Sequence, residues 1–156
     1  MSEFLAQNGE IILRLVVAVG LGMLIGAERL LVREAAGMKT HALVSLGSAL
    51  FIIVSEMLAI KYAGVGGFDP ARIASQVIVG IGFLGAGSII LQGSRLIGLT
   101  TAGGLWVTAG IGMAVGFRLF SMAIIATVLV LFILVIGNLL EKPIRKISGE
   151  IDQPKG

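Results

Sequence analysis

The sequence predicts an all-α integral membrane protein, a bundle of five transmembrane helices. Hydrophobic residues make up 56% of the 156 residues and charged residues only 13%, with a mean hydropathy of +1.03. A soluble domain of this composition would expose a very large apolar surface. The apolar stretches are each close to the ~20 residues that cross ~30 Å of hydrocarbon as a helix. The predicted spans are residues 11–31, 40–62, 71–91, 99–116 and 119–140.

The first span is too long for a secretory signal, and it lacks a preceding basic run and a small-residue cleavage site. We therefore expect it to stay in the mature protein. Gly22 and Gly26 lie about one turn apart, which favours close contact with another helix. Arg14 is expected to extend its side chain to the outer membrane interface.

The first connection carries the densest group of charged and polar residues: Glu28, Arg29, Arg33, Glu34, Lys39, Thr40 and His41. We expect Glu28 to pair with Arg29, Arg33 or Arg95. Thr40 is predicted to cap the second helix, whose N-terminus would favour an anion. Two interpretations remain open: a solvated basic anchor, or a surface that docks a partner or an anion.

Polar residues form stripes on the second and third helices. His41, Ser45, Ser48 and Ser55 lie near one direction on the second helix, beside Glu56, and the third helix carries Arg72, Gln76, Gly80 and Gly87 at related positions. The serines and Gln76 could simply bond to the backbone and hold helices together. Alternatively, the stripes line a narrow polar path for a solute between these two helices. In either case we expect them to point into the bundle.

Glycines are expected to mediate packing in the third and fourth helices. Gly80, Gly82 and Gly85 match the dinucleotide-binding fingerprint, but they lie in an apolar helix without a preceding soluble strand, so we exclude nucleotide binding. Together with Gly87 they are interpreted as packing positions. In the fourth helix a small-residue ridge predicts helix contacts or a dimer face; it consists of Gly104, Thr108, Gly112 and Gly116. Residues 141–156 form a short charged tail that is expected to fray.

The distribution of Lys and Arg predicts an outside N-terminus and an inside C-terminus. The side taken as cytoplasmic holds most of them: Arg29, Arg33, Lys39, Arg95, Lys142, Arg145, Lys146 and Lys155. The other side holds Arg14, Lys61, Arg72 and Arg118. These residues sit at helix ends, so no nucleic-acid surface is expected.

Four motifs in order resemble the MgtC/SapB family of bacterial inner-membrane proteins. They run from Leu24 to Arg29, from Ala36 to Val44, from Arg72 to Gly87, and from Gly98 to Gly112. The resemblance covers about residues 11–140. Within it, the positions that match family motifs are Glu28, Arg29, Gly37, Thr40, Arg72, Gln76, Gly82, Gly85, Gly87, Thr100, Thr101 and Trp106. Lys39 stands where the family usually has arginine, and Gly103 and Gly104 replace a more alanine-rich run.

The resemblance implies a five-helix domain in the inner membrane, associated with adaptation to low magnesium and with survival of pathogens in macrophages. It also implies action on membrane machinery such as the ATP synthase membrane sector or a sensor kinase. Better-known members carry a soluble domain after the last helix, for which the residues after 140 are too few.

Three functional classes follow. A regulator that acts by protein contact fits the glycine ridges, the basic connection and the resemblance, whereas a small-solute or ion transporter fits the polar stripes. An enzyme fits poorly, because one histidine, no cysteine and no paired intramembrane carboxylates supply no catalytic set. For the same reason we expect neither a metal site nor a cofactor. The lipid bilayer and a homodimer are the expected partners besides such machinery.

Overall fold

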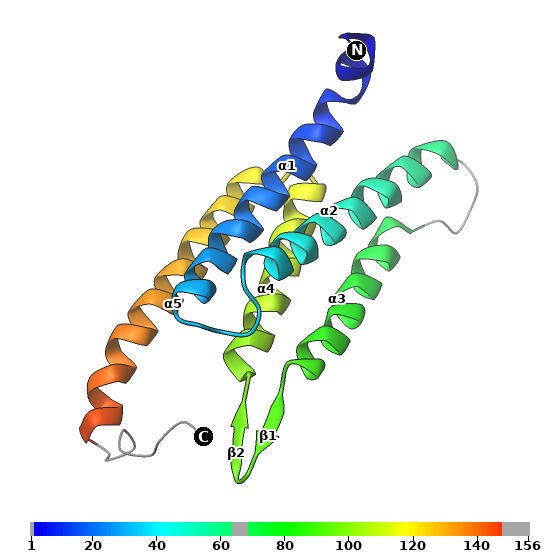
Figure 1. Ribbon diagram of the computed structural model, residues 1–156. Coiled ribbons are helices and arrows are strands. Elements are labelled where there is room, and N and C mark those ends of the chain that lie inside the picture. The colour runs from blue at the N-terminus through cyan, green and yellow to red at the C-terminus, as the bar shows by residue number, and fades with distance from the viewer. Residues whose placement is uncertain (1, 64–68, 148–156) are drawn as a thin grey trace.

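The computed structural model describes residues 2–63 and 69–147, which form five helices and one β-hairpin (Figure 1). The predicted all-α membrane bundle is confirmed. The elements are α1 (Ser2–Leu31), α2 (Met38–Lys61), α3 (Pro70–Gly87), β1 (Ile90–Gln92), β2 (Arg95–Ile97), α4 (Leu99–Gly116) and α5 (Phe120–Ile147).

Four of these helices, α1, α2, α4 and α5, are long and apolar enough to cross a membrane. The apolar part of α3, Ala71–Gly87, is shorter. At 1.5 Å per residue the 18 residues of α3 reach about 27 Å, just below the hydrocarbon thickness. That α3 crosses the membrane, and which end faces the cytoplasm, stay predictions.

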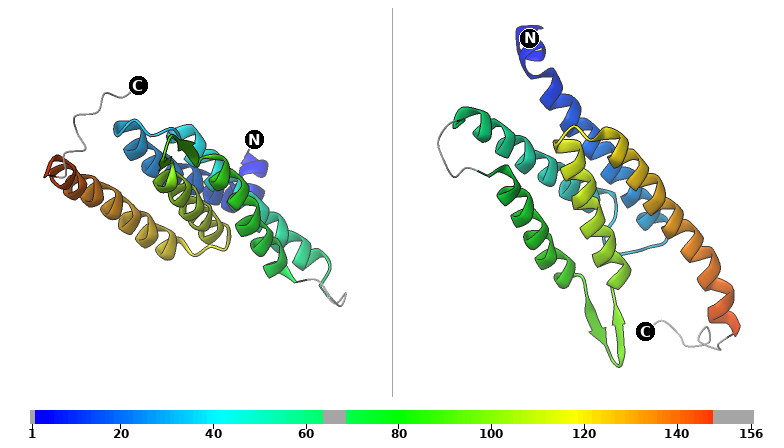
Figure 2. Two further views of the ribbon diagram at one scale, coloured as in Figure 1. Left: turned by 90° about the horizontal axis from the view of Figure 1, so that it is seen from below. Right: turned by 180° about the vertical axis from the view of Figure 1, so that it is seen from behind.

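The predicted third span was wrong at its end, because α3 stops at Gly87 and the chain then forms a hairpin. Ile90 pairs with Ile97, and Leu91 pairs with Leu96, in antiparallel register. Figures 1 and 2 show the hairpin extending beyond the helices at one end of the bundle. This end, where α1, α3 and α5 finish and α2 and α4 begin, is called the hairpin end below.

Two glycines make the hairpin and its return into α4 feasible. Gly93 has φ +63° in the two-residue turn, as hairpin turns require. Gly98 has φ +89° and is the N-cap of α4. A Cβ at Gly98 would also overlap the carbonyl of Ser88, so only glycine lets the two arms of this connection meet here.

Helix α4 contacts all four other helices, and α2 packs against both α1 and α4 (Figure 2). Helices α3 and α5 lie at the flanks, where most of their large apolar side chains face outward. The apolar core joins alanines and branched aliphatic residues: Ala18, Ile25, Ala49, Ile111, Ala114, Val115, Ala123 and Leu134.

Glycines on α1 and α4 bring α2 close on both sides. A Cβ at Gly22 would lie 2.9 Å from the Ser45 Cβ, and one at Gly26 would lie 2.5 Å from the Met38 Cα. From the opposite side, a Cβ at Gly112 would lie 2.8 Å from the Ser45 Cα. Because real Cβ atoms do not approach so closely, the backbones of α1, α2 and α4 depend on these glycines for their spacing.

Helices α1 and α4 end in the same motif, each with an arginine in a left-handed conformation. Arg33 has φ 62° and Arg118 has φ 65°. After each helix, two backbone N–H groups donate to carbonyl groups of its last turn. After α1, Arg33 donates to the Leu30 carbonyl and Glu34 to the Arg29 carbonyl, and the equivalent two bonds follow α4. This Schellman pattern satisfies terminal carbonyls, and its left-handed residue is usually glycine.

Other helix limits also differ from the prediction. The N-cap of α2 is Gly37, without a side-chain cap, so the expected cap by Thr40 was wrong. Helix α1 starts at Ser2 and α5 continues to Ile147, so both helices extend beyond the predicted apolar windows. Residues 148–156, the end of the predicted tail, lie outside the described residues.

Candidate functional site

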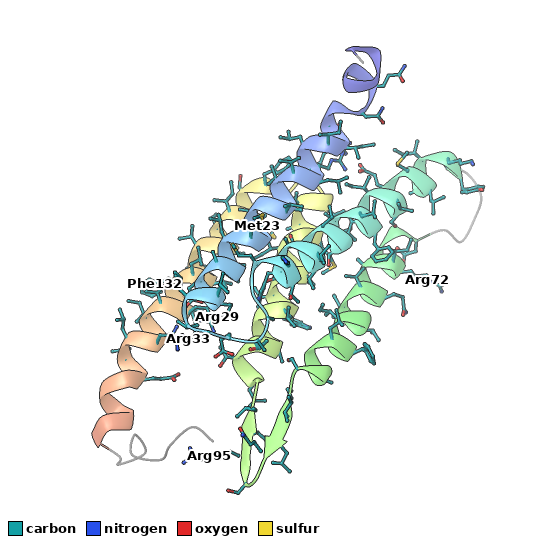
Figure 3. The ribbon with its side chains drawn as sticks, viewed as in Figure 1. Met23, Arg29, Arg33, Arg72, Arg95 and Phe132 are labelled. Atoms are coloured by element: carbon teal, nitrogen blue, oxygen red, sulfur yellow. The ribbon has the colours of Figure 1, made fainter. Side chains whose placement is uncertain are left out.

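A group of buried polar side chains lies near the hairpin end, contributed by α1, α2, α4, α5 and the first connection. We call it the hairpin-end cluster; its members are Glu28, Arg29, Glu34, His41, Ser45, Thr101, Thr108 and Asn138. Figure 3 labels Arg29 within this region and Arg33 beside it. Apart from Glu34 and Asn138, which are partly buried, its side chains are 0–9% exposed.

Glu28 is the centre of one half of the cluster. Its Oε2 accepts a hydrogen bond from Arg29 Nε at 2.5 Å, and its Oε1 accepts one from Asn138 Nδ2 at 2.9 Å. Arg29 is therefore one partner of Glu28 that the sequence predicted, whereas Asn138 was not expected. Both carboxylate oxygens are bonded, which offsets the cost of holding this charge away from water.

His41 joins α2 to α4 in the other half. Its Nδ1 lies 2.8 Å from Thr108 Oγ1, and that hydroxyl donates to the Gly104 carbonyl. The roles of the two ring nitrogens depend on the tautomer, and the backbone of Ala36 is a further hydrogen-bonding neighbour of the ring. The missing side chain at Gly104 leaves room for the ring, because a Cβ there would lie 3.4 Å from His41 Cε1.

The first connection is tied to α4 by one further bond. Thr101, which is 1% exposed, donates to Glu34 Oε2 at 2.9 Å. Together with the backbone bond from Glu34 to Arg29, this contact holds the connection against the bundle.

Three buried polar atoms of the cluster have no hydrogen-bond partner among the described residues: Arg29 Nη2, His41 Nε2 and Ser45 Oγ. They supply donors and an acceptor that suit water or a small polar solute. The part of the chain that the structure describes contains no group of three His, Cys, Asp or Glu residues that could hold a metal ion.

A second network lies at the opposite end of the bundle and surrounds Arg14. The guanidinium is 2% exposed and donates to Glu10, to Glu56 at 2.5 Å and to the Gly116 carbonyl at 3.0 Å. The expectation that Arg14 extends to the interface was therefore wrong. The guanidinium of Arg14 bonds to two carboxylates and to the end of α4. These hydrogen bonds within the protein are more favourable than hydration of the guanidinium at the membrane interface.

Arg118 completes this opposite-end network from the α4–α5 connection. It donates to Glu10 and to Glu56, so each carboxylate receives both arginines. Hydrogen bonding to Glu10 raises the pKa of Arg118 above its ordinary value, so the guanidinium stays charged. Two positive and two negative groups leave the network neutral and link α1, α2 and α4.

A groove of about 600 Å³ lies between α2 and α3. Lys39, Thr40, Ser48 and Gln76 line it, but most of its wall is apolar. The space between these helices is therefore an apolar groove, and not the narrow polar path that was one of the two alternatives. The reason is that His41, Ser45 and Ser55 are buried in the bundle, while the exposed Gln76 lies at the groove on α3 instead of inside the bundle as predicted.

The remaining predicted residues lie apart from the hairpin-end cluster. Exposed side chains are found at Arg33, Lys39, Thr40, Arg72, Thr100 and Trp106. Of the predicted packing positions on α3, Gly85 lies near Ala102, whereas a Cβ at Gly80, Gly82 or Gly87 would meet no atom within 4 Å. Within the described chain these three glycines therefore contact no neighbouring helix closely.

The sequence contains signals for several contacts that we did not predict from it. Glu10 and Arg14 are four residues apart on one helix, a spacing that favours an ion pair. Asn138 is a polar residue within an apolar span, where a buried partner is the usual explanation. Thr108 was assigned to a packing ridge, although its hydroxyl needed a partner too.

Comparison with known proteins places these features in a family. The family model described as the MgtC family matches residues 15–143. The chain is 42% identical over 133 residues to "Putative magnesium transporter YhiD" of Escherichia coli (strain K12), covering 82% of this chain and 60% of that protein. It is 45% identical over 120 residues to "Protein MgtC" of Salmonella typhimurium (strain LT2), covering 77% and 49%.

A third relative, an uncharacterised protein of Haemophilus influenzae, is 41% identical over 139 residues, with 86% of this chain and 58% of the relative covered. The chain thus spans about half to three fifths of the length of these relatives. No solved structure gives a significant match.

Proposed function

Because the chain belongs to the MgtC family, we propose that it is a regulator of membrane machinery that acts by protein contact in adaptation to low magnesium or intracellular stress. Its location in this proposal is the bacterial cytoplasmic membrane. It would contact the ATP synthase membrane sector or a sensor kinase. We assign it no catalytic role.

The observation that carries the proposal is the exposed hairpin. Ile90, Leu91, Leu96 and Ile97 are 44–67% exposed, and the strands have no further pairing partner among the described residues. A two-stranded ribbon with free edges and apolar side chains is suited to pairing with another protein. Arg95 lies in the same hairpin and adds charge to this surface.

A second function, small-solute or ion transport, is supported by two different observations. One relative is named a putative magnesium transporter. In addition, the hairpin-end cluster contains the three buried polar atoms without described partners. Against it, Glu28, Glu34 and Glu56 are bonded to arginine, asparagine or threonine side chains, which leaves few of their oxygens for a hard cation.

The test is complementation of a low-magnesium growth defect by a hairpin double variant, Leu91→Ser with Leu96→Ser. The pair faces outward, so we expect normal membrane abundance with lost complementation. The matched control is Ile124→Ser with Val128→Ser on the exposed face of α5, which should complement normally. Full growth of the hairpin variant at normal abundance would contradict the proposed contact.

A further inference from the structure

The groove between α2 and α3 originates from two glycines. Gly47 of α2 and Gly80 of α3 both line it, and a Cβ at either would meet no atom within 4 Å. Larger side chains of the two helices, including Leu43, Phe51 and Leu84, form the walls around this open space. The groove is therefore built by the absence of side chains on facing helices, not by a gap in the bundle core.

The dimensions of the groove match one leaflet of a bilayer. Its lining on α2 runs from Lys39 to Phe51, which corresponds to about 18 Å along the helix. Half of a typical hydrocarbon core is about 15 Å. The lining along this length is mostly apolar, so an extended acyl chain matches the groove in both length and polarity.

One end of the groove suits an anion. Lys39 and Thr40 line this end, in the first turn of α2. The N-cap Gly37 supplies no side-chain cap, and the first turn contains no acidic residue, so no side chain of this turn neutralises the positive end of the α2 dipole. The rest of the lining carries no charged side chain.

We propose that this groove binds one anionic phospholipid. Its acyl chain lies along Gly47 and Gly80, and its phosphate contacts Lys39, Thr40 and the first-turn amides of α2. The site goes beyond the proposed regulatory function and does not depend on it. It would also cover the side of α3 that the rest of the protein leaves open.

The test is native mass spectrometry of the purified full chain with phosphatidylglycerol or phosphatidylcholine added. We expect the parent to retain one phosphatidylglycerol in preference to phosphatidylcholine. Gly80→Leu and Gly47→Leu place a side chain in the groove, and its Cβ meets no atom within 4 Å. Both variants should lose this lipid, and if one fails to fold the other decides. Gly20→Leu, at an equally open position on α1, should retain it.

The headgroup is tested separately. Lys39→Ala should reduce the preference for phosphatidylglycerol about fivefold, the effect of one cation near an anionic surface. Lys61→Ala, at the other end of α2, should leave the preference unchanged. The proposal would be overturned if the parent retained no lipid, or if the Gly80→Leu and Gly20→Leu variants retained it equally. Binding of a second copy of the chain in place of the lipid would also overturn it.

Discussion

Arg33 and Arg118 occupy equivalent left-handed positions after α1 and α4, but they should respond differently to glycine. Glycine removes the strain of about 1–2 kcal/mol that a side chain meets in this conformation. Arg33→Gly should therefore stabilise the protein by roughly 1 kcal/mol in a thermal unfolding assay. Arg118→Gly also loses the contacts to Glu10 and Glu56, so it should gain less or lose stability. Equal gains from both would show that the contacts of Arg118 to Glu10 and Glu56 contribute nothing to stability.

Gly112 should tolerate even a methyl group poorly. The added Cβ would meet the backbone of Ser45, so Gly112→Ala should destabilise the bundle by about 1–3 kcal/mol through overpacking. Gly110→Ala, two residues away with no atom within 4 Å, is the control and should be neutral or slightly stabilising. Reversible unfolding in detergent measures both. Similar stability of the two variants would disprove the close approach of α2 and α4.

Arg14 should be the most sensitive charged residue at its end of the bundle. Replacing it by methionine keeps the apolar stem but removes its bonds to Glu10, Glu56 and the Gly116 carbonyl. Glu56 keeps Arg118, so the loss should be about 1–3 kcal/mol. Replacing Glu56 by glutamine as well should recover part of this loss. A double-mutant cycle measures the coupling, and additive effects of the two changes would contradict the ion pair.

Individual residues were predictable from sequence where their local pattern determined their surroundings. The serine stripe of α2 was expected to face inward, and His41, Ser45 and Ser55 are each buried. The partners of Arg14 on other helices were not predictable, because Glu56 and the Gly116 carbonyl reach it only after three helices are packed together. Long-range pairing of this kind has no signature in one helix.

At the scale of elements, hydropathy located the helices but not the hairpin. Ile89, Ile90 and Leu91 continue the apolar run of α3, so a window average extends the helix through them. The stronger signal was the Gly93-Ser94 pair between two short apolar segments, which is typical of a hairpin turn. Once Gly98 takes its left-handed conformation, α4 begins in a new direction.

The hairpin should contact protein, whereas the outer face of α5 should contact lipid. A photo-crosslinking residue at Leu96 should give a discrete adduct with a membrane protein of the proposed machinery in cells grown in low magnesium. The same probe at Ile124 of α5 should give no such adduct, since both side chains are more than half exposed but only one lies on the hairpin. Identical adduct patterns at both positions would contradict a specific surface.

For the whole molecule, a neutral and internally bonded set of charges explains how a chain with arginines in its spans remains stable in lipid. Glu28 and Arg29 neutralise each other's charge at the hairpin end, and the carboxylates around Arg14 and Arg118 do the same at the other end. The groove between α2 and α3 is apolar along most of its wall. These features favour a protein that signals by contact over one that conducts a divalent cation.

Magnesium flux into proteoliposomes tests this central claim most directly. Purified protein is reconstituted in vesicles that contain a magnesium-sensitive dye, with protein-free vesicles as the control, and a magnesium gradient is applied. The account predicts the same slow entry in both preparations. Magnesium entry that rises with the amount of protein, and that is abolished by Glu28→Gln in a correctly folded variant, would contradict it.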